Sequence, residues 1–185
     1  MLDWFILQEI NMNRNELIKR IKETAYLEGD FVLRSGKRSK YYLDKYLFET
    51  CPDILKALGK EFAKYVTSDV TLIAGAELGG VALAAATAME TGKNWIIVRN
   101  SKKGYGTGKL IEGRLNRGDV VLLVEDVATT GGQVLEAAKV ITEAGAVVKK
   151  IVCTIDRRQG AEENITSAGY KFESILTKDD LGIKD

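Results

Sequence analysis

Val-Val-Leu-Leu-Val-Glu-Asp-Val-Ala-Thr-Thr-Gly-Gly, residues 120–132, is the stretch of sequence that decides the fold prediction. Its leading apolar residues are typical of a buried parallel strand, which we expect to end at Glu125 and Asp126. The hydroxyls and glycines that follow predict a tight turn, and a helix is expected from near Gln133. Ligands of an open α/β sheet bind at such strand ends. We therefore expect the backbone N–H groups of residues 129–132 to hold a phosphate and the two acids to hold sugar hydroxyls. The plainer alternative is a turn beside a solvated acidic pair.

Strands and helices alternate along most of the chain. Apolar runs predict strands over 71–74, 95–99, 110–112, 120–125, 146–155 and 170–175, and helical periodicity predicts helices over 52–66, 80–90, 132–144 and 160–168. Short links between alternating elements indicate an α/β fold with a mostly parallel central sheet flanked by helices on both faces. The length fits a single domain over residues 1–185, with its α/β core over 49–176.

The N-terminal part, residues 13–48, does not follow this rhythm. Its start resembles a capping box and predicts a helix over 14–27, which Gly29 is expected to end. Strands are predicted over 31–34 and 41–47. We expect this part to form a small hood over the carboxyl edge of the sheet.

Bulk composition excludes several classes of protein. A net charge of +1 gives no general attraction to nucleic acid or to membranes, and no apolar run approaches the ~20 residues of a spanning helix. Residues 1–11 lack the features of a signal peptide; they are either a non-essential extension or an amphipathic piece that covers apolar surface. The absence of histidine excludes a Ser-His-Asp device and a histidine-ligated metal. Two cysteines make no disulfide framework, so a cytoplasmic location is expected.

Two more loops point to anion binding. Residues 75–80, Gly-Ala-Glu-Leu-Gly-Gly, follow a predicted strand and repeat the strand–turn–helix layout, although such glycines also serve tight packing alone. Residues 99–109 carry four cationic side chains and three glycines. This loop is either a solvated connection or a lid that lays Arg and Lys over a polyphosphate. A Walker loop is rejected, because Leu110 stands where the magnesium-binding Ser or Thr belongs.

Four segments together resemble a known family. Residues 120–132 resemble the phosphoribosyl pyrophosphate (PRPP) signature of type I phosphoribosyltransferases. The loop 99–109 with 110–113, the segment 31–44 (Phe-Val-Leu-Arg-Ser-Gly-Lys-Arg-Ser-Lys-Tyr-Tyr-Leu-Asp) and the segment 156–161 (Asp-Arg-Arg-Gln-Gly-Ala) narrow the resemblance to orotate phosphoribosyltransferases. The segments occur in the family's order and span most of the chain.

This resemblance implies transfer of phosphoribose from PRPP to orotate in pyrimidine biosynthesis. It also implies Mg²⁺ bound through PRPP rather than by protein ligands, and a homodimer whose lid reaches the partner's site. The implied catalytic residues are Lys103, Glu125 and Asp126. The implied PRPP-binding residues are Ala76, Glu77, Gly79, Arg99, Lys102, Lys103, Tyr105, Glu125, Asp126, Val127, Ala128, Thr129, Thr130, Gly131, Gly132 and Gln133. The implied orotate-binding residues are Lys37, Tyr41, Tyr42, Thr129 and Arg157.

The chain departs from the family pattern at three positions. Asn100 stands where a second basic residue is common, Tyr105 replaces a frequent histidine, and Lys40 replaces a usual proline. These departures affect details of the lid more than the reaction class. Two alternatives stay open: a type I transferase for another base, and a non-catalytic PRPP- or nucleotide-binding regulator of the same fold.

Overall fold

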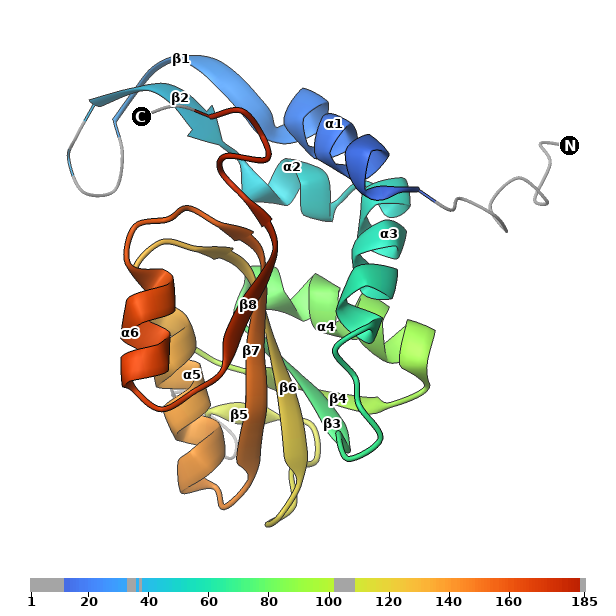
Figure 1. Ribbon diagram of the computed structural model, residues 1–185. Coiled ribbons are helices and arrows are strands. Elements are labelled where there is room, and N and C mark those ends of the chain that lie inside the picture. Colours follow the sequence, from blue (N-terminus) through green and yellow to red (C-terminus); the bar gives the residue numbers. More distant parts are fainter. Residues whose placement is uncertain (1–11, 33–35, 37, 102–108, 184–185) are drawn as a thin grey trace, which may run out of the picture.

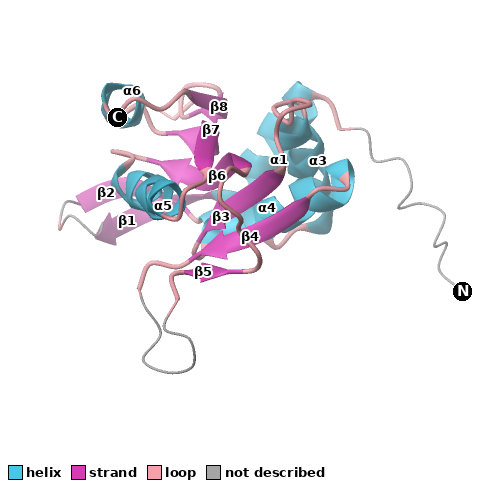
Figure 2. Cartoon of the chain, turned by 90° about the horizontal axis from the view of Figure 1, so that it is seen from below, coloured by secondary structure: helices cyan, strands magenta, loops and turns pink. Residues whose placement is uncertain are grey.

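The computed structural model describes residues 12–32, 36, 38–101 and 109–183, which form two sheets. The larger sheet has six strands in the order β5-β4-β3-β6-β7-β8. Its strands are β3 (Leu72–Ala76), β4 (Asn94–Val98), β5 (Ile111–Glu112), β6 (Val120–Ala128), β7 (Val147–Asp156) and β8 (Phe172–Thr177). All neighbouring pairs are parallel except β4 with the short edge strand β5 (Figure 2). The predicted mostly parallel sheet is confirmed.

Helices cover both faces of this sheet (Figure 1). The helices are α1 (Arg14–Ala25), α2 (Lys45–Glu49), α3 (Pro52–Ala63), α4 (Gly79–Thr91), α5 (Gly132–Glu143) and α6 (Ala161–Ser167). Alternation along β6 sends Leu122 and Val124 to the face covered by α1, α3 and α4, and Val121 and Leu123 to the face covered by α5 and α6. The strand β6 therefore contributes to two apolar cores, one on each side of the sheet, as a strand inside a sheet covered on both faces does.

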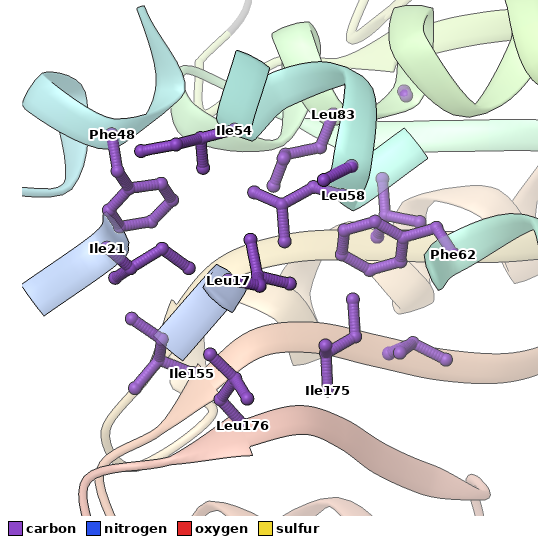
Figure 3. Packing of buried hydrophobic residues seen from close by; sticks show 14 of the residues in the cluster. Leu17, Ile21, Phe48, Ile54, Leu58, Phe62, Leu83, Ile155, Ile175 and Leu176 are labelled. Carbon is purple, nitrogen blue, oxygen red and sulfur yellow. The ribbon is translucent and has the colours of Figure 1, made fainter. Parts of the chain in front are cut away.

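The predicted hood consists of α1, α2 and the antiparallel pair β1 (Tyr26–Val32) and β2 (Arg38–Leu43). Figure 1 shows these elements above one end of the larger sheet. Leu17 and Ile21 of α1 and Phe48 of α2 pack with α3 and with Ile155 and Leu176 of the sheet (Figure 3). The hood is thus attached to the sheet through a continuous apolar core.

Two predictions for the hood were wrong. The capping box at Asn13 forms, but α1 ends at Ala25, and Gly29 lies inside β1, at a shift of register between Glu28 and Phe31. The second error concerns the strand predicted over 41–47. The chain leaves β2 at Leu43 and turns into α2, where the side chain of Asp44 accepts a hydrogen bond from the backbone N–H of Tyr46. In both places cross-strand pairing and capping outweigh the apolar pattern.

The strand of the PRPP-like stretch is longer than predicted. The ladder with β7 continues as far as Ala128, which pairs with Asp156. Glu125 and Asp126 therefore lie within β6 instead of ending it, and both are buried. Among the helices of the described residues, none is long and apolar enough to cross a membrane.

Candidate active site

A cavity of about 210 Å³ lies where β6 turns into α5. It is lined by Lys45 and by residues 125–134, which include every residue predicted from the turn itself. Gly131 precedes α5 with a φ of 78°, and a Cβ there would lie 2.9 Å from the Ile165 side chain. Only glycine suits this position, because both the backbone conformation and the space exclude a side chain. The turn therefore presents the free N–H groups of a helix N-terminus to the cavity.

The acidic pair lies at the cavity in a cluster of four ionisable residues. Asp126 has no exposed surface, and its Oδ2 forms an ion pair with the Nζ of Lys45 from α2. Glu125 and Glu49 are each 5% exposed. Lys45 and Glu49 were not predicted as site residues. The signal for them was Asp44, which caps the short helix that carries both.

Burial determines the ionisation of this cluster. Burial and the charge of Asp126 raise the pKa of Glu49 to about 8. The same two causes raise the pKa of Glu125 well above its ordinary value. For Lys45, burial lowers the pKa, but the attraction of Asp126 outweighs it, and the net shift is upward. Burial thus favours the neutral form of both glutamic acids, beside one ion pair, that of Lys45 with Asp126.

The second glycine turn joins β3 to α4 directly beside the acidic pair. A Cβ built on Gly79 would lie 1.5 Å from Oδ2 of Asp126, and one on Gly75 would lie 2.2 Å from the carbonyl oxygen of Gly80. These glycines thus allow tight packing, which was the alternative to an anion cradle. The turn nevertheless lies next to the first cavity, so both functions are compatible with it.

Glu77 in this turn connects three segments. Its Oε1 lies 3.4 Å from Arg99, and its Oε2 accepts a hydrogen bond of 3.1 Å from the backbone N–H of Asn100. Its backbone carbonyl accepts hydrogen bonds from the side chains of Asn100, at 2.9 Å, and of Gln133, at 2.7 Å. Asn100, which stands where the resemblance leads one to expect a basic residue, is therefore held by Glu77. Glu77 fastens the start of the 99–109 loop to both glycine turns.

Arg157 follows β7 and lies beside the turn, because its N–H donates to the carbonyl of Ala128 at 2.9 Å. Its guanidinium donates to the hydroxyl of Tyr41 at 3.1 Å and lies 5.9 Å from the centre of that ring. Tyr41 in turn stacks on Tyr26. Tyr42 points elsewhere: it is 42% exposed and lies against Phe31. Of the two tyrosines, the structure brings Tyr41 to Arg157.

Four predicted site residues lie outside the described residues: Lys37, Lys102, Lys103 and Tyr105. Within the described ranges, no group of three or more His, Cys, Asp or Glu side chains is arranged to hold a metal ion.

The fold, with a glycine turn and an acidic pair lining one cavity, agrees with the phosphoribosyltransferase class that comparison with known families gives. The family described as "Phosphoribosyl transferase domain" matches residues 49–178, and the chain has the type I phosphoribosyltransferase fold. Curated relatives are more specific. The orotate phosphoribosyltransferase of Methanocella arvoryzae is 41% identical over 167 residues, which are 90% of this chain and 95% of that protein. That of Pyrococcus horikoshii is 45% identical over 172 residues, 91% of this chain and 92% of its own. The chain belongs to the orotate phosphoribosyltransferase family.

Solved structures agree with this assignment. An orotate phosphoribosyltransferase of Mycobacterium tuberculosis, determined in complex with PRPP, aligns with a TM-score of 0.79 and 28% identity, and covers 92% of this chain and 99% of that chain. The enzyme of Aeropyrum pernix aligns with a TM-score of 0.78 and 31% identity over 89% of this chain and 95% of that one. The predicted family and fold are confirmed.

Proposed function

We propose that this chain transfers the 5-phosphoribosyl group of PRPP to orotate, giving orotidine 5′-monophosphate and pyrophosphate in pyrimidine biosynthesis. The single observation that carries the proposal is the cavity at residues 125–134, which joins a helix N-terminus to a buried acidic pair in a member of this family. The N–H groups of Thr129 to Gly132 suit the 5′-phosphate. Glu125 and Asp126 line the same cavity, where the ribose hydroxyls of the same molecule would meet them.

The reaction breaks the C–O bond at the anomeric carbon of PRPP and forms a C–N bond to the base. Charge develops on the ribose ring and on the departing pyrophosphate, so positioning and electrostatic stabilisation by the protein accelerate it. A protein nucleophile is not required, because deprotonated orotate carries an anionic ring nitrogen. We assign the pyrophosphate to the turn of Ala76, Glu77 and Gly79, with Arg99 beside it. Lys102, Lys103 and Tyr105 are assigned to the same group from the sequence resemblance alone.

The base is assigned to the space between β2 and the end of β7. Arg157 carries a planar guanidinium that can pair with the orotate carboxylate through two parallel hydrogen bonds. In the structure this guanidinium is held by Tyr41, whose ring already stacks on another aromatic side chain. A second flat ring, that of orotate, would find a comparable surface here. Thr129 and Lys37 complete the proposed set, whereas Tyr42 lies against Phe31 instead.

Magnesium is proposed to enter bound to PRPP. The acidic pair supplies carboxylate oxygens, the donors that Mg²⁺ prefers. However, both acids are buried, and Asp126 already pairs with Lys45. The residues present therefore fit an ion held mainly by substrate oxygens and water, with Glu125 and Asp126 acting on the ribose. When bound, the ion neutralises charge on the pyrophosphate.

The remaining assignments concern assembly and location. We propose one domain over residues 1–185, with a hood over 13–48 and a core over 49–176, and the apolar contacts of α1 and α2 with the sheet support a single domain. A homodimer that shares the 99–109 loop between subunits is proposed from the family resemblance. Mixing an inactive Lys103→Ala subunit with an inactive Asp126→Asn subunit tests it: recovered activity supports sharing, and its absence overturns it. A cytoplasmic location is proposed because Cys51 and Cys153 are both free.

The fall in orotate absorbance with PRPP and Mg²⁺ tests the proposed reaction. Adenine, guanine, xanthine and uracil serve as alternative bases. We expect turnover with orotate, and Asp126→Asn should lower it by on the order of 10²-fold, as the loss of one transition-state hydrogen bond does. Turnover of another base instead of orotate would overturn the assignment of the substrate. Binding of PRPP without consumption of any base would favour a regulator.

A further inference from the structure

Lys45 reaches the acidic pair from the hood. It is the first residue of α2, directly after the capping residue Asp44, and its ammonium pairs with Oδ2 of Asp126. The side chain of Lys45 is 29% exposed, whereas that of Asp126 is 1% exposed. The ammonium also lies 5.2 Å from the centre of the Tyr46 ring, which limits its freedom on the other side. A buried carboxylate on the sheet is thus held by a cation that belongs to a different part of the fold.

The environment of Asp126 leaves Lys45 as its charge partner. The other carboxyls of the cluster, Glu49 and Glu125, supply no positive charge, and each has one buried oxygen without a hydrogen-bond partner among the described residues. No second ion pair of Asp126 is found within the described part of the chain. Removing one partner of a buried ion pair leaves an uncompensated charge, which is unfavourable. Lys45 is therefore the charge partner that holds Oδ2 of Asp126 in place.

The opposite side of Asp126 is closed by backbone. The Cα of Gly79 lies so close that an added Cβ would overlap Oδ2, Cγ and Cβ of Asp126. The carboxylate is consequently enclosed between the second glycine turn, the strand β6 and Lys45 of the hood. Because Lys45 also lines the cavity, substrate bound there would lie next to this ion pair.

We propose that Lys45 is a positioning residue, which fixes the Asp126 carboxylate for the ribose of PRPP and so makes the docking of the hood part of the PRPP site. The inference rests on the proposed function and extends it, since it gives the hood a role toward PRPP in addition to orotate. Lys45 acts through Asp126. Its loss is expected to misplace the carboxylate, and a misplacement of 1 Å lowers rates by about 10²-fold.

A double-mutant cycle tests the proposal. The variants are Lys45→Met, which keeps the length of the stem without the charge, Asp126→Asn, and the two combined. Lys19→Met is the matched control, because Lys19 forms an exposed helical ion pair with Glu23. For each variant, kcat and KM for PRPP are measured with orotate in excess, and Tm is measured separately. Lys45→Arg, which retains the charge, is the second variant in case Lys45→Met does not fold.

We expect Lys45→Met to lower kcat/KM for PRPP by about 10²-fold at a temperature well below its Tm, and Lys45→Arg to recover most of this loss. On the Asp126→Asn background, Lys45→Met should lower kcat/KM by less than about threefold, because residues that act as a unit are non-additive. A full further loss on that background would mean that Lys45 contacts substrate directly and would overturn the positioning role. Near wild-type kcat/KM in both Lys45 variants, with or without a fall in Tm, would overturn it too. Inactivity of the wild type with PRPP and orotate would instead refute the proposed function.

Discussion

Among the glycines that the structure describes, Gly79 is the one where an added Cβ would lie closest to another atom, so Gly79→Ala is expected to damage the active site. The new Cβ would lie 1.5 Å from Oδ2, 2.4 Å from Cγ and 2.9 Å from Cβ of Asp126, whereas ordinary contacts are 3.4 Å or longer. Rotating the carboxylate end is not enough, because the overlap includes the base of the side chain. The carboxylate must retreat by about 2 Å or the turn must move by a similar amount, and a displacement of 1 Å already lowers rates by about 10²-fold.

The expected result is a loss of at least about 10²-fold in kcat/KM for PRPP, measured from the fall in orotate absorbance. Gly59→Ala is the matched control. Its Cβ would lie 3.0 Å from the backbone of Ala86, at the contact of α3 with α4 and away from the cavity. That variant should lower Tm while keeping the KM for PRPP. If Gly79→Ala retained kcat and KM within about threefold, the close approach of this turn to Asp126 would have no catalytic consequence and the reasoning would be refuted.

Three further predictions use the same assay or its stability counterpart. Arg157→Ala should raise the activation free energy that corresponds to kcat/KM for orotate by about 2–5 kcal/mol, the scale of a truncated buried charge pair. The same substitution should affect any reaction with uracil far less, and equal losses would exclude Arg157 as the specificity residue. Glu77→Ala should raise the KM for PRPP by about tenfold with a smaller change in kcat, because the start of the 99–109 loop loses the two contacts that the Glu77 carboxylate makes with Arg99 and Asn100. Glu61→Ala, at an exposed pair, should change neither parameter. The pKa of Glu49 is raised from 4.5 to about 8, so the folded state holds a proton that the unfolded state releases, and this contribution to stability is present below pH 4.5 and is lost as pH rises through 8. Urea unfolding of wild type and Glu49→Gln should therefore diverge between pH 5 and 8, by at most about 1.4 kcal/mol per pH unit, and parallel curves would contradict the prediction.

The sequence predicts the core of this fold well, because its signals are local. In β6 and α5, an apolar run, two glycines and a helical period follow one another within 25 residues of chain, and each can be recognised without knowing its neighbours. The same holds for β3 with α4. The resemblance in residues 120–132 therefore predicts the turn and its acidic pair without any tertiary contact.

The hood was predicted less well, because its structure depends on pairing across the chain. Gly29 resembles a helix stop, but it lies in a strand whose register shifts between Glu28 and Phe31. A glycine inside a strand pattern is itself a signal of such an irregularity. The five residues of α2 are too few to show a period, so only the capping side chain of Asp44 distinguished them from a continued strand.

The same dependence explains which site residues were missed. Lys45 and Asp126 lie 81 positions apart, and no spacing rule connects a lysine in a short hood helix with a carboxylate in a buried strand. An ionised carboxylate inside a sheet is unfavourable unless a partner reaches it. Burial of the acidic pair within β6 therefore implies a cation from elsewhere, once the length of the strand is known. Because that cation comes from the hood, the packing of Leu17, Ile21 and Phe48 against the sheet also sets the electrostatics of the active site.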